Sequence, residues 1–441
     1  MSCSSRGAAC ARFSRDHSYR RLAYKVLACL LMAGSLAACS GGGVSPSPGS
    51  GSTASNRIAK LKSIVQASAN GSYIGAYVNP TGGQGPTEGQ LETETEALEG
   101  DPLVNKFLTT HLHYMNWTAL LQATSDSGLA SDRTLHRTPI ISWSCGDDHT
   151  LDGNGKPLDL IEIANGFADA DLENISTQLA KLQGTQGGSY PVLLRYFWEF
   201  NINAANVPGY TNASAKPTND GCFTPQGAAT GIPAEPYAPA LPLQFKQAWI
   251  HIWQVFSAVR PRPNVSFVWN PSVIGSIDDG NVAIDASPYY PGNQYVDWIA
   301  GDGYDRVLKS TGLPEGYAQV FGSFYSEYTQ SLYQPNGIQV PLMIGETAAC
   351  QQYDALFPPQ YDQVAYINSL SQALQSLEIA PSPNFPAIQS LNYFDSDTGS
   401  YEIPTNHEQC IWALTSGSNG GVGAYGQIMN TPFFEQSIPG S

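Results

Sequence analysis

Short apolar runs alternate with loops and with stretches of helical spacing from Ile58 to the end of the chain. Eight of these runs are rich in β-branched and aromatic residues, and they predict strands at Tyr73–Val78, His113–Trp117, Pro139–Trp143, Pro191–Trp198, Val265–Trp269, Val296–Ala300, Val340–Ile344 and Ile388–Phe394. Helical spacing lies between most of them, at Leu172–Leu182, Phe245–Val259, Val320–Tyr328 and Tyr361–Leu377. This alternation predicts an α/β protein with a parallel sheet. Eight strands in a chain of this length favour one (β/α)8 TIM barrel over residues 58–441.

The long segment Asn203 to Pro242 follows the fourth predicted strand and is rich in Gly, Pro, Ala and Asn. In a barrel of this kind, the loops after the strands build the active site. We therefore expect this loop to form one wall of a cleft.

Composition narrows the classes of partner. Of the 441 residues, 13% are charged and 11% are aromatic, and the net charge is −16. This composition excludes a disordered chain and supports a large core. An acidic surface repels polyanions, so we expect no nucleic acid and no direct binding to an anionic membrane surface. A neutral partner is more consistent with this net charge than a polyanion is.

The N-terminus has the pattern of an export signal. Basic residues precede a short apolar run, Val26 to Ala38, which is too short to span a bilayer as a helix. The run ends in Leu36-Ala37-Ala38-Cys39, which resembles the bacterial lipobox, in which the Cys is acylated. We expect residues 1–38 to be a signal peptide and residues 39–57 a flexible tether, which would anchor the exported protein by lipid to a bacterial membrane, with Ser40 favouring the outer membrane. The alternative is an ordinary cleaved signal in which Cys39 is incidental.

Four further cysteines remain after processing: Cys145, Cys222, Cys350 and Cys410. An even number in an oxidising compartment predicts two disulfides, for which three connectivities exist. We favour Cys145 with Cys222 and Cys350 with Cys410, because each pair would join loops on adjacent units of the barrel.

Two glutamates each end a buried apolar run, Glu199 after the fourth predicted strand and Glu346 after the seventh. The C-terminal ends of barrel strands converge at one mouth, and two carboxylates about 5–5.5 Å apart there perform retaining glycoside hydrolysis. The structural alternative is that each glutamate forms a stabilising ion pair with Arg195 or with a lysine.

Signals for cofactors are weak. His111 and His113 alternate onto one strand face, but the sequence reveals no third ligand, so we expect no metal. The run Gly421 to Gly426 matches GxGxxG, but too little chain follows to complete a βαβ unit, so a glycine-rich turn is favoured and no cofactor is expected.

Several segments resemble glycoside hydrolase family 26, the β-mannanases. They match in order along the chain: Ile163 to Asp169, Arg195-Tyr196-Phe197-Trp198-Glu199-Phe200-Asn201, Trp269-Asn270-Pro271, Tyr289 to Trp298, Asp302-Gly303-Tyr304 and Ile344-Gly345-Glu346. The resemblance covers roughly Tyr73 to Phe394. It implies a TIM barrel and a retaining mechanism, with Glu346 as the nucleophile and Glu199 as the acid/base.

The resemblance also implies roles for the residues around the glutamates. Tyr304 would donate to Glu346, and Arg195 and Asn201 would orient the carboxylates or the sugar. Four aromatic residues are candidate stacking platforms under sugar rings: Trp143, Trp269, Trp298 and Tyr393.

Trp198 stands where the family has His. An indole offers only an N–H donor, so a contact to the sugar beside the cleavage point is changed. The expected function is hydrolysis inside a neutral β-linked polysaccharide, with β-1,4-mannan first, by a monomer. The alternatives are a β-glucan, a β-1,3-xylan or an exopolysaccharide as substrate, or a surface lipoprotein that binds polysaccharide without cleaving it.

Overall fold

The computed structural model describes residues 71–81, 86–143, 160–182, 190–203, 242–273, 282–283, 285–305, 307–308, 313–314, 316–327, 340–349, 363–379, 388–397, 411–435 and 438. All of them belong to one of the two compact units into which the chain divides, Ser52–Ser441. The expected signal peptide, Cys39, the tether and the four cysteines expected to pair lie outside the described residues. These expectations therefore stay predictions.

The described strands form a closed barrel. Eight parallel strands follow one another around it: β1 (Ser72–Asn79), β2 (Thr110–Met115), β3 (Thr138–Trp143), β4 (Val192–Tyr196), β6 (Val265–Trp269), β8 (Trp298–Asp302), β11 (Leu342–Thr347) and β12 (Ile388–Ser396). β12 pairs with β1 in parallel, from Tyr73 beside Ser390 to Asn79 beside Ser396, and this pairing closes the barrel. The predicted TIM barrel is confirmed.

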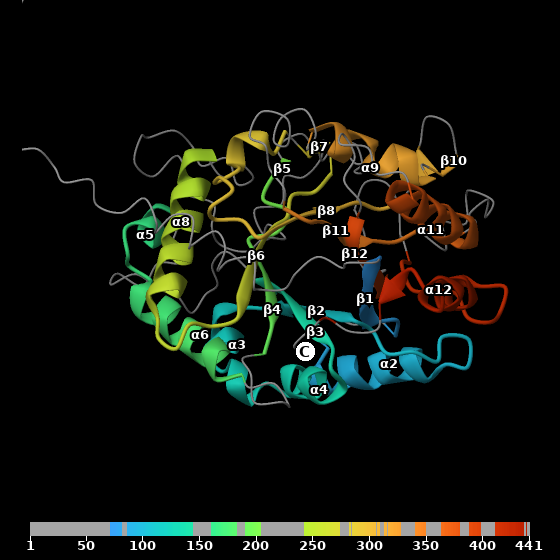
Figure 1. Cartoon of the computed structure of the whole chain (residues 1–441), viewed down its shortest axis with the longest axis horizontal. Coiled ribbons are helices and arrows are strands. Elements are labelled where there is room, and N and C mark those ends of the chain that lie inside the picture. Colours follow the sequence, from blue (N-terminus) through green and yellow to red (C-terminus); the bar gives the residue numbers. More distant parts are fainter. Residues whose placement is uncertain are drawn as a thin grey trace, which may run out of the picture. The chain divides into compact units, whose positions relative to one another are not determined.

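Helices surround the strands (Figure 1). They are α2 (Glu88–Gly100), α3 (Trp117–Leu120), α4 (Ser127–Leu135), α5 (Leu160–Ala164), α6 (Asp169–Lys181), α8 (Pro242–Ala258), α9 (Gly316–Glu327), α11 (Gln363–Ile379) and α12 (Gly421–Met429). Short strands complete the described elements: β13 (Phe434–Glu435) joins β1, β5 (Ile202–Asn203) pairs with β7 (Val282–Ala283), and β9 (Val307–Leu308) pairs with β10 (Leu313–Pro314).

Strand alternation decides which side chains enter the barrel. On β4, Leu193 belongs to the core cluster inside the barrel, whereas Val192 and Leu194 belong to the larger core between strands and helices. Side chains alternate across a strand, so Arg195 also points into the barrel. The same alternation on β2 sends Leu112 and Tyr114 inward, and His111 and His113 toward the helices.

Seven of the eight barrel strands differ from their predicted bounds by one to three residues, and two of these differences have a clear local cause. β2 begins three residues earlier than expected and ends at Met115, because Asn116 caps α3 by accepting a hydrogen bond from the Ala119 N–H at 2.8 Å. β4 ends at Tyr196, two residues early, because Phe197 and Glu199 have φ angles of 50° and 55°, which an extended strand cannot accommodate. Of the expected loop after β4, residues 204–241 lie outside the described residues.

The glycine-rich run forms the helix α12, and the turn expected there is wrong. A Cβ at Gly426 would lie 2.2 Å from the Leu103 carbonyl oxygen, so glycine lets this helix approach the loop after α2. Close packing against Leu103 thus explains why glycine is needed at position 426 of this helix. Of the helices in the described part of the chain, none has the length and apolar character needed to cross a membrane.

Candidate active site

Glu346 lies near the C-terminal end of β11, and its side chain is buried. Both carboxylate oxygens accept hydrogen bonds: Arg195 Nη2 donates to Oε1 at 2.5 Å, and the Tyr304 hydroxyl donates to Oε2 at 2.5 Å. The Glu346 backbone is held as well, because its carbonyl accepts from the Gly303 N–H at 3.0 Å. Donors on both oxygens fix the orientation of the carboxyl group.

Arg195 organises the floor of the site from inside the barrel. Its Nη1 donates to Asn270 Oδ1 at 3.0 Å and to Asp302 Oδ1 at 3.2 Å, and its Nε donates to Ser142 Oγ at 3.1 Å. Burial alone would lower the pKa of Arg195, but the charges of Asp302 and Glu346 raise it. The guanidinium therefore stays charged and joins four strands at one point.

The residue before the nucleophile candidate must be glycine. A Cβ at Gly345 would lie 2.2 Å from Asn270 Oδ1 and 2.4 Å from Asp302 Oδ1. Because no side chain fits there, the polar groups of β8 and of the segment after β6 can approach β11 closely. The Gly-Glu pair in the sequence thus reflects the packing around Arg195.

Asp302 adds a second buried carboxyl, which the sequence marked only as part of a matching segment. Burial and then the charge of Glu346 raise its pKa well above the usual value, while Arg195 works in the opposite direction. One guanidinium thus faces two carboxyl groups. Such crowding is typical of functional sites.

Glu199 sits on a strained turn just after β4, and its side chain is partly exposed. Its backbone N–H donates to the Asn270 carbonyl at 2.8 Å, which ties the turn to the segment after β6. The charges of both Glu199 and Glu346 raise the pKa values of Asp302 and Tyr304, after the larger effect of burial. The structure therefore brings the two glutamates to the same mouth of the barrel.

Aromatic rings line this mouth. Tyr114 lies 5.3 Å from Trp198 and 6.4 Å from Phe394, measured between ring centroids. Tyr304 lies 5.9 Å from Phe394 and 5.0 Å from Trp412. Four of these five side chains are partly exposed, and Trp412 is 7% exposed. The sequence analysis did not single out Tyr114, Phe394 or Trp412.

The expected stacking platforms lie elsewhere. The side chains of Trp143, Trp269, Trp298 and Tyr393 are at most 1% exposed. Trp143, for example, packs against Trp117 at 4.6 Å and against Tyr196 at 5.1 Å. A ring with no exposed face cannot stack on a sugar, so the structure contradicts this expectation. Strand-end aromatics point inward or outward by alternation, which a list of aromatic residues does not reveal.

Asn201 does not face the mouth either. Its side chain is buried, its Nδ2 donates to the Ser272 carbonyl at 2.9 Å, and its Oδ1 accepts from the Ser272 N–H at 2.8 Å. It therefore joins the turn after β4 to the segment after β6.

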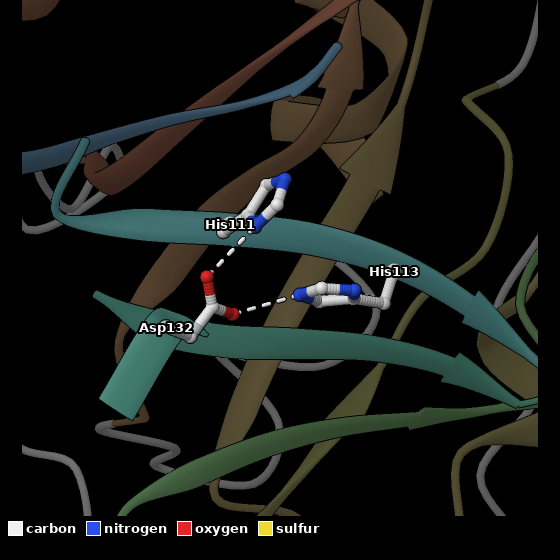
Figure 2. A group of neighbouring side chains, drawn as sticks. All are labelled: His111, His113 and Asp132. Carbon is white, nitrogen blue, oxygen red and sulfur yellow. Dashed lines mark hydrogen bonds and ion pairs between the residues drawn. The ribbon is translucent and has the colours of Figure 1, made fainter. Parts of the chain in front are cut away.

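A second cluster of titratable residues lies outside the barrel, between β2 and α4 (Figure 2). Asp132 accepts from His111 Nδ1 at 2.8 Å through one oxygen and from His113 Nε2 at 2.7 Å through the other. Arg137 Nη1 lies 3.3 Å from Asp132 Oδ1, and Arg137 Nη2 pairs with Glu99 Oε2 at 2.5 Å. All of these groups are buried.

Asp132 is the third potential metal ligand that the sequence did not reveal. Two histidines and one carboxylate are a known ligand set. However, hydrogen bonds from both rings and a nearby guanidinium already neutralise Asp132. Burial would lower the pKa of His113, but Asp132 and Glu88 raise it to about 10. The expectation of no metal stays a prediction.

The barrel is similar to solved structures. An endo-β-1,4-mannanase double mutant from Cellulomonas fimi matches with a TM-score of 0.51 and 12% identity, over 87% of this chain and 75% of the other. The catalytic domain of a family 26 endo-β-1,4-mannanase from Bacillus sp. JAMB-750 matches with a TM-score of 0.51 and 13% identity, over 86% of this chain and 90% of the other. At this identity the likeness shows the fold. No protein-family model and no curated protein sequence matches the chain.

Proposed function

We propose that this protein is a retaining glycoside hydrolase of the family 26 type, acting on a neutral β-linked polysaccharide. Glu346 is the nucleophile and Glu199 the acid/base. The observation that carries the proposal is Glu346 itself, a buried carboxylate at the end of β11 with Arg195 on one oxygen and Tyr304 on the other. Glu199 follows β4 at the same mouth, and partly exposed rings surround both.

The chemistry follows from these positions. Glu346 attacks the anomeric carbon, the bond to the leaving oxygen breaks, and Glu199 gives its proton to that oxygen. Glu199 then takes a proton from water, and the resulting hydroxide displaces Glu346 from the sugar. Two inversions retain the β configuration. Arg195 and Tyr304 hold Glu346 for the attack, and Tyr304 stays protonated because burial and the charge of Glu346 raise its pKa.

We propose β-1,4-mannan as the first substrate to test, because the matching segments resemble family 26 and the similar solved structures are named endo-β-1,4-mannanases. One observation favours a different sugar in the same mechanism. Trp198 packs on Tyr114 where the family has a His, so a ring pair replaces a group that donates and accepts hydrogen bonds.

The decisive experiment separates the two glutamates. Wild-type protein is incubated with mannan, β-glucans, β-1,3-xylan and bacterial exopolysaccharides, and reducing ends are measured. NMR of the first product should show the β-anomer. The Glu199→Ala variant should lose polysaccharide cleavage, retain much of its glycosylation rate on an activated aryl glycoside, and yield a β-glycosyl azide when azide is added. Glu173→Ala, an exposed glutamate on α6, is the matched control.

Each outcome has a defined meaning. An α-anomer appearing first means inversion and refutes the roles assigned to both glutamates. Binding to a glycan without any release of reducing ends means a carbohydrate-binding barrel.

We also propose that Cys39 anchors the protein by lipid to a membrane, on the evidence of the sequence alone. The Cys39→Ser variant should move to the soluble fraction, and the wild type should incorporate labelled fatty acid. Retention of the variant in membranes, with no label in the wild type, contradicts the anchor.

Non-reducing peptide mapping should pair Cys145 with Cys222 and Cys350 with Cys410.

A further inference from the structure

Residues 411–415 are hydrogen-bonded to the C-terminal end of β12 and contact Tyr304 of the candidate site. Trp412, in this segment, lies with its ring 5.0 Å from the ring of Tyr304 at an interplanar angle of 44°. Tyr304 donates its hydroxyl proton to Glu346 Oε2. The segment is therefore one ring contact away from the nucleophile, although it follows Glu346 by more than sixty residues in the sequence.

Gln363 on α11 holds this segment in place. Its side chain is buried, and its Nε2 lies 3.1 Å from the Ala413 carbonyl oxygen and 3.2 Å from the Ala349 carbonyl oxygen. Its Oε1 accepts from the Thr415 N–H at 2.9 Å and from the Thr415 hydroxyl at 3.0 Å. One glutamine thus joins the segment to the residues that follow β11.

Strand β12 supplies two further hydrogen bonds. The Trp412 N–H donates to the Ser396 carbonyl at 3.0 Å, and the Leu414 N–H donates to Asp395 Oδ1 at 2.7 Å. Backbone groups on both sides of Trp412 are therefore fixed. A loop with this many bonds to two neighbouring elements holds its side chain in one orientation.

Tyr304 needs such support. Its hydroxyl reaches Glu346 only while the ring keeps one orientation, and the ring contacts Phe394 at 5.9 Å and Trp412 at 5.0 Å. Without Trp412, one of these two ring contacts is lost. A hydrogen-bond donor displaced by about 1 Å costs catalysis on the order of a hundredfold.

We propose that Trp412 is a positioning residue for the nucleophile: the segment 411–415, fixed by Gln363 and β12, holds the Trp412 indole against Tyr304, so that the Tyr304 hydroxyl stays on Glu346. This inference rests on the proposed function, because it assigns Trp412 a part in the same reaction. Trp412 acts through Tyr304 and need not touch the sugar.

The first test measures Tyr304 without any substrate. 3-Fluorotyrosine is placed at position 304, and its ¹⁹F resonance is compared between the otherwise wild-type protein and the Trp412→Ala and Gln363→Ala variants. Both variants should shift and broaden the resonance. Two matched controls should leave it unchanged: Trp253→Ala removes a tryptophan of α8 whose ring lies 5.2 Å from that of Tyr295, and Gln375→Ala removes a glutamine that donates to Ser371 within α11. An unchanged resonance in Trp412→Ala overturns the proposal.

The second test is kinetic. Trp412→Ala and Gln363→Ala should each lower kcat by about 10- to 100-fold with little change in KM, and Trp412→Phe, which keeps a ring, should restore most of the rate. A raised KM with unchanged kcat means that Trp412 binds the sugar and overturns the positioning role. If the wild type cleaves no glycan, the proposed function fails, while the ¹⁹F measurement still decides whether Trp412 positions Tyr304.

Discussion

Two buried clusters of charged residues lie on the two faces of the barrel wall. They contain the same types of side chain, but we assign one to function and the other to stability. The inner cluster is Arg195, Asp302 and Glu346, inside the barrel. The outer cluster, between β2 and the helices α2 and α4, is Glu99, His111, His113, Asp132 and Arg137. Each contains an arginine held by carboxylates, so residue type alone does not separate a site from a structural network.

The difference lies in charge balance and in access. In the outer cluster, Asp132 contacts His111, His113 and Arg137, and the two histidines lower its pKa despite burial. Arg137 also pairs with Glu92 and Glu99. In the inner cluster, Arg195 is the cation that pairs with both Asp302 and Glu346, and burial, followed by the charge of Glu346, raises the pKa of Asp302. The inner cluster also borders the partly exposed side chains at the mouth of the barrel, whereas the partly exposed neighbours of the outer cluster are its ion-pair partners Glu88 and Glu92. A carboxyl group whose pKa is raised at an opening indicates function, and one whose pKa is lowered by paired cationic groups indicates stability.

The largest expected effect is on turnover, from the inner cluster. Glu346→Gln keeps the shape of the side chain but removes the nucleophile, so kcat should fall by about 10⁴-fold or more on every substrate. The free energy of unfolding should not fall, because the change removes a charge that crowds Asp302. Activity is measured on the best substrate, and stability by urea unfolding.

Full activity in Glu346→Gln would end its assignment as nucleophile. A large loss of stability together with activity would show instead that the inner cluster is structural, as the outer one is.

The next effect is on stability, from the outer cluster. Asp132→Asn leaves His113 and Arg137 buried without their shared anion, so the free energy of unfolding should fall by about 3–5 kcal/mol. The folded fraction should keep its kcat, because none of these groups reaches the mouth. Urea unfolding and kinetics at a temperature where the variant is folded measure the two quantities, with Asp171→Asn on α6 as the control. A lost kcat in folded Asp132→Asn would contradict the separation of the two clusters.

The outer cluster also predicts how stability depends on pH. The pKa of His113 is raised to about 10 in the folded protein by Asp132 and Glu88, against the effect of burial, from an ordinary value near 6.5. Its contribution is therefore fully present below about pH 6.5 and is lost as the pH rises through 10, with a slope of at most about 1.4 kcal/mol per pH unit.

The pKa of Asp132 is lowered by His111 and His113, despite burial, so its contribution is fully present above its ordinary pKa of 3.8 and is lost as the pH falls below that value. Chemical unfolding between pH 6 and pH 10 measures the slope. Asp132→Asn should flatten it, and an equal slope in wild type and variant would rule out His113 as its source.

The sequence predicted the fold well, because strand and helix patterns depend on local alternation. Val265–Trp269 is both the predicted and the observed strand, and β12 begins at the predicted Ile388. The errors came from backbone conformations that local patterns do not encode. The positive φ at Phe197 ends β4 early. The glycine run that we expected to form a turn is a helix, and its Gly426 packs closely against the Leu103 backbone.

The candidate site was predicted in part. The two glutamates, Arg195 and Tyr304 lie together as expected, because strand ends of one barrel converge. Most of the aromatic residues at the mouth were not predicted from the sequence. Tyr393 and Phe394 are neighbours in the sequence, but only Phe394 is partly exposed, and which of the two faces the mouth depends on the register of β12 against β1. Trp412 could not be placed from its sequence position, since its segment is held at the mouth by a hydrogen bond from Gln363 to the Ala413 carbonyl and by one from the Leu414 N–H to Asp395.

The smallest expected effect concerns Trp198, at the rim of the inner cluster. The Trp198 ring lies 5.3 Å from the Tyr114 ring, and Trp198 directly precedes Glu199 in the sequence. A substitution of Trp198 therefore changes the surroundings of the proposed sugar site and leaves Glu346 in place. Trp198→His restores a group that can accept a hydrogen bond, and it should preserve or raise mannan hydrolysis, within about tenfold of wild type, which is the scale of one pocket contact. Trp198→Phe keeps a ring without the N–H and separates packing from hydrogen bonding. The ratio of kcat/KM on mannan to that on β-glucan measures the effect. A folded Trp198→His protein that loses all activity on its best substrate would show that the indole itself selects a different sugar.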